Sequence, residues 1–155
     1  MELHSASFAH GAPIPVRHTC DGANTSPPLS WSAVPDGAKS LALIVDDPDA
    51  PDPKAPKRIW VHWVLYNIPP SQRELLEGGS RSPVPRHARE GLNDGGNPGY
   101  DGPCPPIGRH RYFHTLYALD TVLPDLGQGA TRKDLDAAMQ GHILASAQLM
   151  GTYAR

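Results

Sequence analysis

The stretch "LALIVDDPDAP", from Leu41 to Pro51, carries the clearest signal of the fold. It opens with an uninterrupted apolar run that ends in β-branched Val45, which is typical of a strand buried on both faces. Acidic residues and prolines follow directly. Pro48 and Pro51 fix their own φ angles and keep the preceding residues out of helical conformation. The stretch therefore predicts a central strand that leads into a rigid, acidic, extended turn.

Three more apolar runs predict strands, and clusters of Pro, Gly, Asn and Asp separate them. The runs are "IWVHWVLYNI" (59–68), "RYFHTLYAL" (111–119) and "HILASAQLMGTY" (142–153). In the last run, alternation places Ile143, Ala145, Ala147 and Leu149 on one face, as in a half-buried strand. This pattern is typical of an all-β sandwich. Because no repeat or linker divides the 155 residues, we expect residues 1–155 to form a single, mainly β domain.

Two short helices are expected as connectors. One has Ser71 as its N-cap and ends at Gly78. The other begins at Thr131, which with Asp134 resembles a capping box, and ends at Gly141. Neither carries residues that suggest chemistry, so both are interpreted as structural.

Composition excludes several classes of function. The net charge is −2 and the basic residues are scattered, which argues against a nucleic-acid partner. No segment approaches the roughly 20 apolar residues of a membrane helix. The first 15 residues lack the features of a secretory signal, so the default location is the cytoplasm. No cofactor motif is present, and we expect none to be bound.

The two cysteines, Cys20 and Cys104, are too few for a disulfide scaffold and do not have zinc-site spacing. The favoured interpretation is two reduced or buried thiols. A single disulfide that bridges two loops is the alternative.

The segment between Ser80 and Pro106 has little periodicity, and a loop of that length is usually functional or mobile. Two acidic residues lie at the end of the buried strand. Asp47 and Asp49 would project the same way if the chain stays extended, or they belong to an ordinary Asp-Pro turn. His62 lies among apolar neighbours, where histidine is most often a satisfied core residue; otherwise its ring must face a cavity.

The run that follows the glycine–proline loop has an unusual polar face. His110, Tyr112 and His114 point to one side of a strand, and Arg111 points to the other. Because proline donates no N–H, the few remaining N–H groups of the loop, such as that of Gly102, could be aimed outward. Histidine, aspartate and tyrosine side chains around such a loop suit a small anion, phosphate above all.

The same residues allow three catalytic or metal-binding alternatives. A zinc site could use His62, His110 or His114 with Asp47, but no HExxH-type spacing is present. Cys104 could act as a nucleophile, but it lies between prolines and not at a helix N-terminus. A serine triad has no GxSxG motif to support it. We therefore expect neither an enzyme nor a metal protein.

Several motifs together resemble one family. "DPDAP" (47–51), "VHWVLYNIP" (61–69) and "GPCPPIGRHRYFHTLYALD" (102–120) resemble the phosphatidylethanolamine-binding protein (PEBP) family, also called Raf kinase inhibitor-like proteins. "TCDGANTSPPLSW" (19–31) and the final "MGTYAR" are similar to its bacterial branch. The resemblance covers essentially the whole chain.

The resemblance implies a β-sandwich of a large and a small antiparallel sheet, with a few short helices and a pocket for phosphate-type anions and phospholipid headgroups. It also implies a homodimer. The ligand-binding residues that it implies are Asp47, Asp49, Trp60, His62, Gly102, Pro103, Pro105, Pro106, His110 and Tyr112. In this interpretation Asp47 orients His62 or His110, and Tyr112 donates its hydroxyl.

The implied function is binding of a small phosphorylated or anionic ligand, with modulation of a kinase or protease partner. The alternatives are a regulatory interaction protein whose pocket is secondary, and a cryptic hydrolase. The chain departs from the family pattern at two positions: His114 stands where an aromatic residue is expected, and Gly95 where a Phe often follows the Asn-Asp pair.

Overall fold

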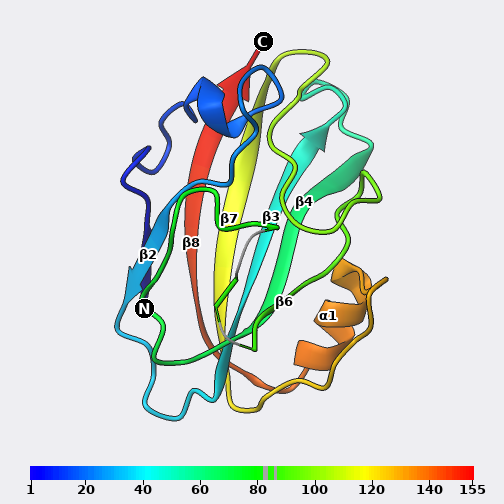
Figure 1. Cartoon of the computed structure of the whole chain (residues 1–155). Coiled ribbons are helices and arrows are strands. Elements are labelled where there is room, and N and C mark those ends of the chain that lie inside the picture. Colours follow the sequence, from blue (N-terminus) through cyan, green and yellow to red (C-terminus); the bar gives the residue numbers. More distant parts are fainter. Residues whose placement is uncertain (82–83, 86) are drawn as a thin grey trace.

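Two antiparallel sheets form the protein in a computed structural model that describes residues 1–81, 84–85 and 87–155 (Figure 1). The large sheet has the strand order β6-β4-β3-β7-β8, and the small sheet has the order β1-β2-β5. The strands are β1 (Glu2–His4), β2 (Leu29–Ser32), β3 (Ser40–Ala50), β4 (Arg58–Ile68), β5 (Glu74–Leu75), β6 (Arg89–Glu90), β7 (Arg109–Leu119) and β8 (Ile143–Ala154). The predicted mainly β fold with a large and a small sheet is confirmed.

Strand β3 is the middle strand of the large sheet, between β4 and β7. Its apolar run is buried on both faces: Leu41 and Leu43 face the core between the sheets, whereas Ala42 and Ile44 face a second apolar cluster. The acidic stretch after this run is extended, as expected, but it belongs to β3 itself. The strand continues to Ala50, which pairs with Arg58 of β4.

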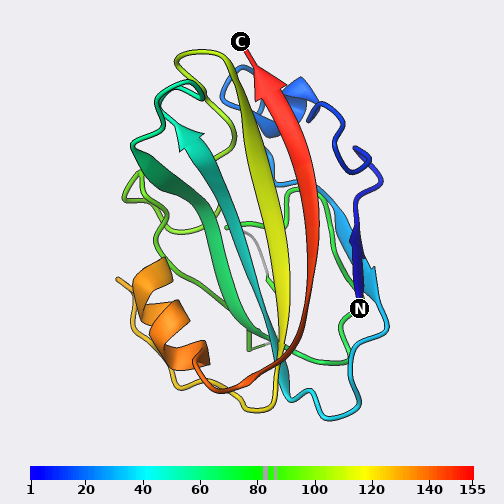
Figure 2. The same cartoon turned by 180° about the vertical axis from the view of Figure 1, so that it is seen from behind.

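One helix covers the second cluster. Helix α1 (Arg132–Met139) buries Leu135 and Met139 against the outer face of the large sheet. Figures 1 and 2 show α1 at the side of the sheet that carries β4 and β6. Its predicted capping box is present, because the Thr131 side chain accepts from the Asp134 N–H and the Asp134 carboxylate accepts from the Thr131 N–H.

The predicted helix after Ser71 is wrong. Residues Glu74–Leu75 form strand β5, which pairs with Leu29 and Ser30 of β2. Leu75 is buried in the core between the sheets, so pairing and burial together outweigh the local helical signal. The other helical element in the described residues is a 3-10 turn, η1 (Val16–His18), which the sequence interpretation did not include.

The last strand follows its predicted alternation except at one end. Ala145, Ala147 and Leu149 pack on the core, but Ile143 is 47% exposed. The register of β8 against β7 shifts between Ala118 and Leu119, and this irregularity turns Ile143 away from the shared face.

The predicted long loop between Ser80 and Pro106 contains the short strand β6 in its described part. Residues 82, 83 and 86 of that prediction lie outside the described residues. Across the described ranges, no helix is long and apolar enough to cross a membrane.

Candidate ligand-binding pocket

A cavity of about 480 Å³ opens where the ends of β3, β4 and β7 meet the loop that precedes β7. It brings together eight of the predicted site residues: Asp47, Trp60, His62, Gly102, Pro105, Pro106, His110 and Tyr112. The other lining residues are Cys20, Asn24, Ala50, Pro51, Gly95, Asn97, Asp101 and Cys104. Asp49 and Pro103 do not line it.

A β-bulge in β4 turns His62 toward this cavity. Val45 pairs with Trp63 and the next residue, Asp46, pairs with Val61, so His62 has no partner on β3. A bulge lets two consecutive side chains lie on one side of a sheet. Trp63 therefore fills the core between the sheets while His62 lines the cavity.

His62 is neither a fully satisfied core residue nor an exposed one. Its side chain is buried, and Nδ1 lies 2.7 Å from the Asp101 carbonyl oxygen. That carbonyl can only accept, so Nδ1 carries a proton and donates. Burial lowers the pKa of His62 below its ordinary value, although the Asp101 carbonyl and nearby carboxylates oppose the shift.

His110 has both ring nitrogens engaged. Nδ1 lies 2.6 Å from Oδ2 of Asp47, and Nε2 lies 2.8 Å from the Ile107 carbonyl oxygen. Because the Ile107 carbonyl oxygen can only accept, Nε2 carries a proton and donates, and a single proton lies between Nδ1 and the Asp47 carboxyl group. Asp47 thus orients His110, one of the two histidines that the sequence interpretation offered. The pair contributes no net charge to the pocket.

Tyr112 supplies a hydroxyl without a partner. The residue is 1% exposed, and its hydroxyl oxygen is buried with no hydrogen bond in the described part of the chain. The ring packs edge-on against His62, with 5.3 Å between centroids. Burial raises the pKa of Tyr112, so its hydroxyl keeps its proton and remains a donor.

Asp49 binds Arg111, whose side chain lies on the opposite side of the sheet from the cavity. Its two carboxylate oxygens bind the Arg111 side chain at 2.9 and 3.0 Å, and Oδ2 also accepts from the Arg111 N–H at 2.9 Å. These hydrogen bonds lower the pKa of Asp49 despite its burial. Asp47 and Asp49 therefore do not both line the cavity, and Arg111 faces away from it as predicted.

The loop before β7 is hydrogen-bonded to the segment around Cys20 and Asn24 at both Gly102 and Pro103. The Gly102 N–H donates to Oδ1 of Asn24 at 2.8 Å, so the expectation that it is aimed at a ligand is wrong. Pro103 accepts from the Cys20 N–H through its carbonyl oxygen at 3.1 Å. These two hydrogen bonds hold the loop against the segment that carries Cys20 and Asn24.

Cys20 and Cys104 form a disulfide, with 5.4 Å between their Cα atoms. The favoured interpretation of two thiols is wrong and its alternative, a bridge between two loops, is confirmed. Because the two cysteines are 84 residues apart, the local sequence around each does not indicate that their loops meet. The bond removes Cys104 as a candidate nucleophile in this state.

Asp101 and Asn24 are pocket residues that the sequence interpretation missed. The Asp101 carboxylate accepts from Arg81 at 3.0 Å, Asn93 at 2.8 Å and Asn97 at 3.0 Å. Burial alone would raise the pKa of Asp101, but these hydrogen bonds lower it. The density of Asn, Asp and Gly from 93 to 102 was a usable signal, because such residues often fix loops through side-chain to backbone hydrogen bonds.

His114 does not line the cavity, although it shares a strand face with His110 and Tyr112. It is 1% exposed and packs against Phe8, with 5.4 Å between ring centroids. Burial lowers the pKa of His114 to about 4. Over the described residues, no group of three or more His, Cys, Asp or Glu side chains is placed to hold a metal ion.

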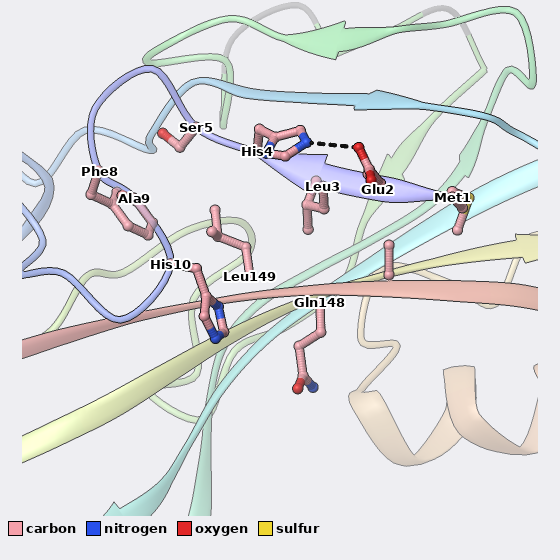
Figure 3. A pocket seen from close by; sticks show the side chains of 11 residues that line it. Met1, Glu2, Leu3, His4, Ser5, Phe8, Ala9, His10, Gln148 and Leu149 are labelled. Carbon is pink, nitrogen blue, oxygen red and sulfur yellow. Dashed lines mark hydrogen bonds and ion pairs between the residues drawn. The ribbon is translucent and has the colours of Figure 1, made fainter.

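A second groove, of about 470 Å³, lies between β1 and β8 (Figure 3). Leu3, Phe8 and Leu149 line it, together with an exposed ion pair between His4 and Glu2. Its polar groups are exposed or paired, whereas the first cavity is lined by Tyr112, whose buried hydroxyl has no partner in the part of the chain that the structure describes. The first cavity is therefore the stronger candidate site.

Comparisons with known proteins agree with the fold. Residues 4–154 match the family described as phosphatidylethanolamine-binding protein. A UPF0098 protein from Methanothermobacter thermautotrophicus is 53% identical over 100% of this chain and 99% of its own length. Another from Chlamydia pneumoniae is 50% identical over 99% of this chain and 98% of its own.

Solved structures give the same result. A PEBP homologue from Chlamydia trachomatis superposes with a TM-score of 0.90 and 47% identity, covering 99% of this chain and 97% of that one. YbcL of E. coli, described as a new member of the mammalian PEBP family, has a TM-score of 0.90 and 32% identity, covering 99% and 98%. From the match over nearly its whole length and from these relatives, the chain belongs to the phosphatidylethanolamine-binding protein family.

Proposed function

We propose that this protein binds a small phosphate-type anion in the cavity around His62 and Tyr112. The observation that carries the proposal is the buried Tyr112 hydroxyl, which has no hydrogen-bond partner among the described residues. A buried polar group left unpaired costs about 1–3 kcal/mol, and an oxyanion that accepts from it would offset that cost. Hydrogen bonds to charged acceptors are also the stronger kind.

The charges in the pocket are compatible with this ligand. The Asp47 carboxyl group is hydrogen-bonded to His110 at 2.6 Å, and the Asp101 carboxylate is paired with Arg81 at 3.0 Å. An anion would therefore not face an uncompensated carboxylate. Trp60 and the prolines supply the apolar wall that small-ligand sites commonly have. The name of the matched family, phosphatidylethanolamine-binding protein, points to ligands of the same chemical kind.

Titration with inorganic phosphate tests the proposal, with calorimetry and histidine NMR signals as readouts. Saturable binding that shifts the His62 signals is expected. Tyr112→Phe should weaken it about 10- to 100-fold, as expected for a lost hydrogen bond to a charged group. Tyr117→Phe is the matched control, because Tyr117 packs on the opposite cluster under α1. An absence of saturable binding to the wild type would overturn the proposal.

Modulation of a kinase or protease partner and a homodimer stay predictions of the family resemblance, and a cytoplasmic location stays a prediction from the N-terminal sequence. A pull-down with His110→Ala would separate the first of these from anion binding. Loss of both partner and anion would tie them to one site, whereas a retained partner would place the interface elsewhere.

A further inference from the structure

We infer that the Cys20–Cys104 disulfide is a thiol-exchange site, and that its reduction loosens the rim of the cavity. The rim is the run of residues 104–108, which leads into strand β7. The co-reactant is a small thiol of the glutathione class or a dithiol. The exchange and the change in the rim need no ligand, whereas an effect on anion affinity rests on the proposed function.

The disulfide lies where a small molecule can reach it. Cys20 and Cys104 are both exposed, and both line the cavity. A thiolate can therefore approach the bond from solvent or through the cavity while the chain stays folded. Exposed disulfides are typically the labile or regulatory ones, whereas structural disulfides resist reduction by the glutathione pool.

The two segments that the bond joins are also held together by hydrogen bonds. The Cys20 N–H donates to the Pro103 carbonyl oxygen at 3.1 Å. The Gly102 N–H donates to Oδ1 of Asn24 at 2.8 Å. Neither hydrogen bond involves a sulfur atom. The chain up to Pro103 should therefore stay in place when the disulfide is reduced.

The rim itself depends more on the disulfide. Ile107 and Gly108 are exposed, and the prolines of the rim have no N–H to donate. The Ile107 carbonyl oxygen accepts from Nε2 of His110 at 2.8 Å, which is a contact within the same loop. Over the described residues, no hydrogen bond joins the rim to the segment around Cys20. The disulfide is therefore the tie between the rim and that segment.

Reduction follows ordinary thiol–disulfide exchange. An external thiolate attacks one sulfur of the bond, forms a mixed disulfide with that cysteine and releases the other cysteine as a thiolate. A second external thiol then attacks the mixed disulfide, and the reagent leaves as its own disulfide. Both cysteines end as thiols. The two external thiols have supplied two electrons and two protons.

A loosened rim alters the cavity because the rim forms part of its wall. Pro105 and Pro106 line the cavity. The Ile107 carbonyl oxygen also holds His110, which is hydrogen-bonded to Asp47. In the reduced protein, binding must first order this run of chain, and that requirement lowers affinity. We expect the reduced protein to bind inorganic phosphate about 2- to 10-fold more weakly than the oxidised protein.

The first test is whether exchange occurs in the folded protein. The oxidised protein is incubated without oxygen at neutral pH in a series of glutathione redox buffers. Free thiols are then trapped with a maleimide and counted by mass spectrometry. Both thiols should appear together while near-UV circular dichroism keeps the signal of the folded protein. A bond that is reduced only when the protein unfolds would refute the exchange site.

The second test measures the rim without any ligand. Nitrogen-15 relaxation should show the order parameters of the Ile107 and Gly108 amides falling on reduction from about 0.85 to below about 0.6. The Gly102 amide is the internal control, because its hydrogen bond lies outside the rim. The double variant Cys20→Ser, Cys104→Ser should resemble the reduced wild type and should not respond to the reductant. Equal order parameters in both redox states would refute the loosened rim.

The third test separates this inference from the proposed function. Inorganic phosphate is titrated by calorimetry into the oxidised and the reduced protein. Weaker binding after reduction is expected, and equal affinity would refute control of the ligand by the disulfide. If phosphate binds in neither state, the proposed function fails, whereas the thiol counts and the order parameters still decide the exchange site and the rim.

Discussion

At the scale of single residues, three buried histidines have different electrostatic roles. His110 is hydrogen-bonded to Asp47, His62 is fixed in one tautomer by Asp101, and His114 packs against Phe8. All three are at most 5% exposed. Burial alone therefore does not set the role of a histidine, since its hydrogen-bond partners decide which ring nitrogen donates and which can accept.

The first prediction concerns His114 and acid stability. Its pKa is about 4 in the fold and 6.5 for an unperturbed histidine, so below pH 6.5 the unfolded chain binds a proton at this residue that the folded chain does not bind. This residue should therefore remove about 2 kcal/mol of unfolding free energy between pH 7.5 and pH 5. Over the same pH range, the His114→Phe variant should lose about 2 kcal/mol less unfolding free energy than the wild type. Urea unfolding at both pH values measures the difference.

The control for this experiment is His4→Gln, which alters an exposed histidine. It should leave the pH dependence of the wild type in place. An equal loss of stability in the wild type and in His114→Phe would contradict the assignment of a neutral, buried His114.

At the scale of elements, short irregularities in the strands decide which side chains lie on each face of the large sheet. The bulge in β4 places His62 and Trp63 on one side of the large sheet, and the shift in β8 exposes Ile143. A strict two-residue alternation would put His62 opposite Trp63. The pocket therefore depends on a bulge that a period-two pattern cannot reveal.

The second prediction concerns the start of α1. Thr131 caps the helix, and the helix covers the outer apolar cluster through Leu135 and Met139. Thr131→Ala should lower the free energy of unfolding by about 1 kcal/mol, because an N-cap oxygen is lost. Thr131→Ser should cost much less, since serine caps as well as threonine. Chemical denaturation of both variants checks this, and equal losses would show that the cap hydroxyl is not responsible.

At the scale of the whole molecule, the disulfide joins parts of the chain that are 84 residues apart. Cys20 follows η1, and Cys104 lies in the loop before β7. Further hydrogen bonds support the same junction, including that of the Tyr100 hydroxyl to the His18 carbonyl oxygen at 2.6 Å. Because both cysteines line the cavity, the bond fixes two of its walls relative to each other.

The third prediction concerns this bond. A cross-link across so long an interval restricts the unfolded chain, so the double variant Cys20→Ser, Cys104→Ser should be about 2–5 kcal/mol less stable. Treating the wild type with a dithiol reductant should bring its urea midpoint close to that of the variant, which should itself not respond. If the reductant does not change the urea midpoint of the wild type, the bond is absent or inaccessible.

The sequence by itself determined the β-sandwich class, the buried central strand, the face shared by His110, Tyr112 and His114, and the capping box of α1. These features depend on local periodicity or on residues three positions apart, which the order of residues records directly. The motifs also identified the family and eight residues of the cavity wall.

Only the tertiary structure decided which histidine Asp47 holds, that Asp49 turns to Arg111, that Asn24 uses the N–H of Gly102, and that the cysteines are bonded. Tertiary pairing with β2 also makes the segment after Ser71 a strand, where a helix was expected. Each of these features depends on partners that are distant along the chain. The intrinsic preference of a short segment for helix or strand is small compared with the free energy of strand pairing or of a buried ion pair. The chemistry of the pocket therefore follows from which polar groups are already paired, and not from which residues are present.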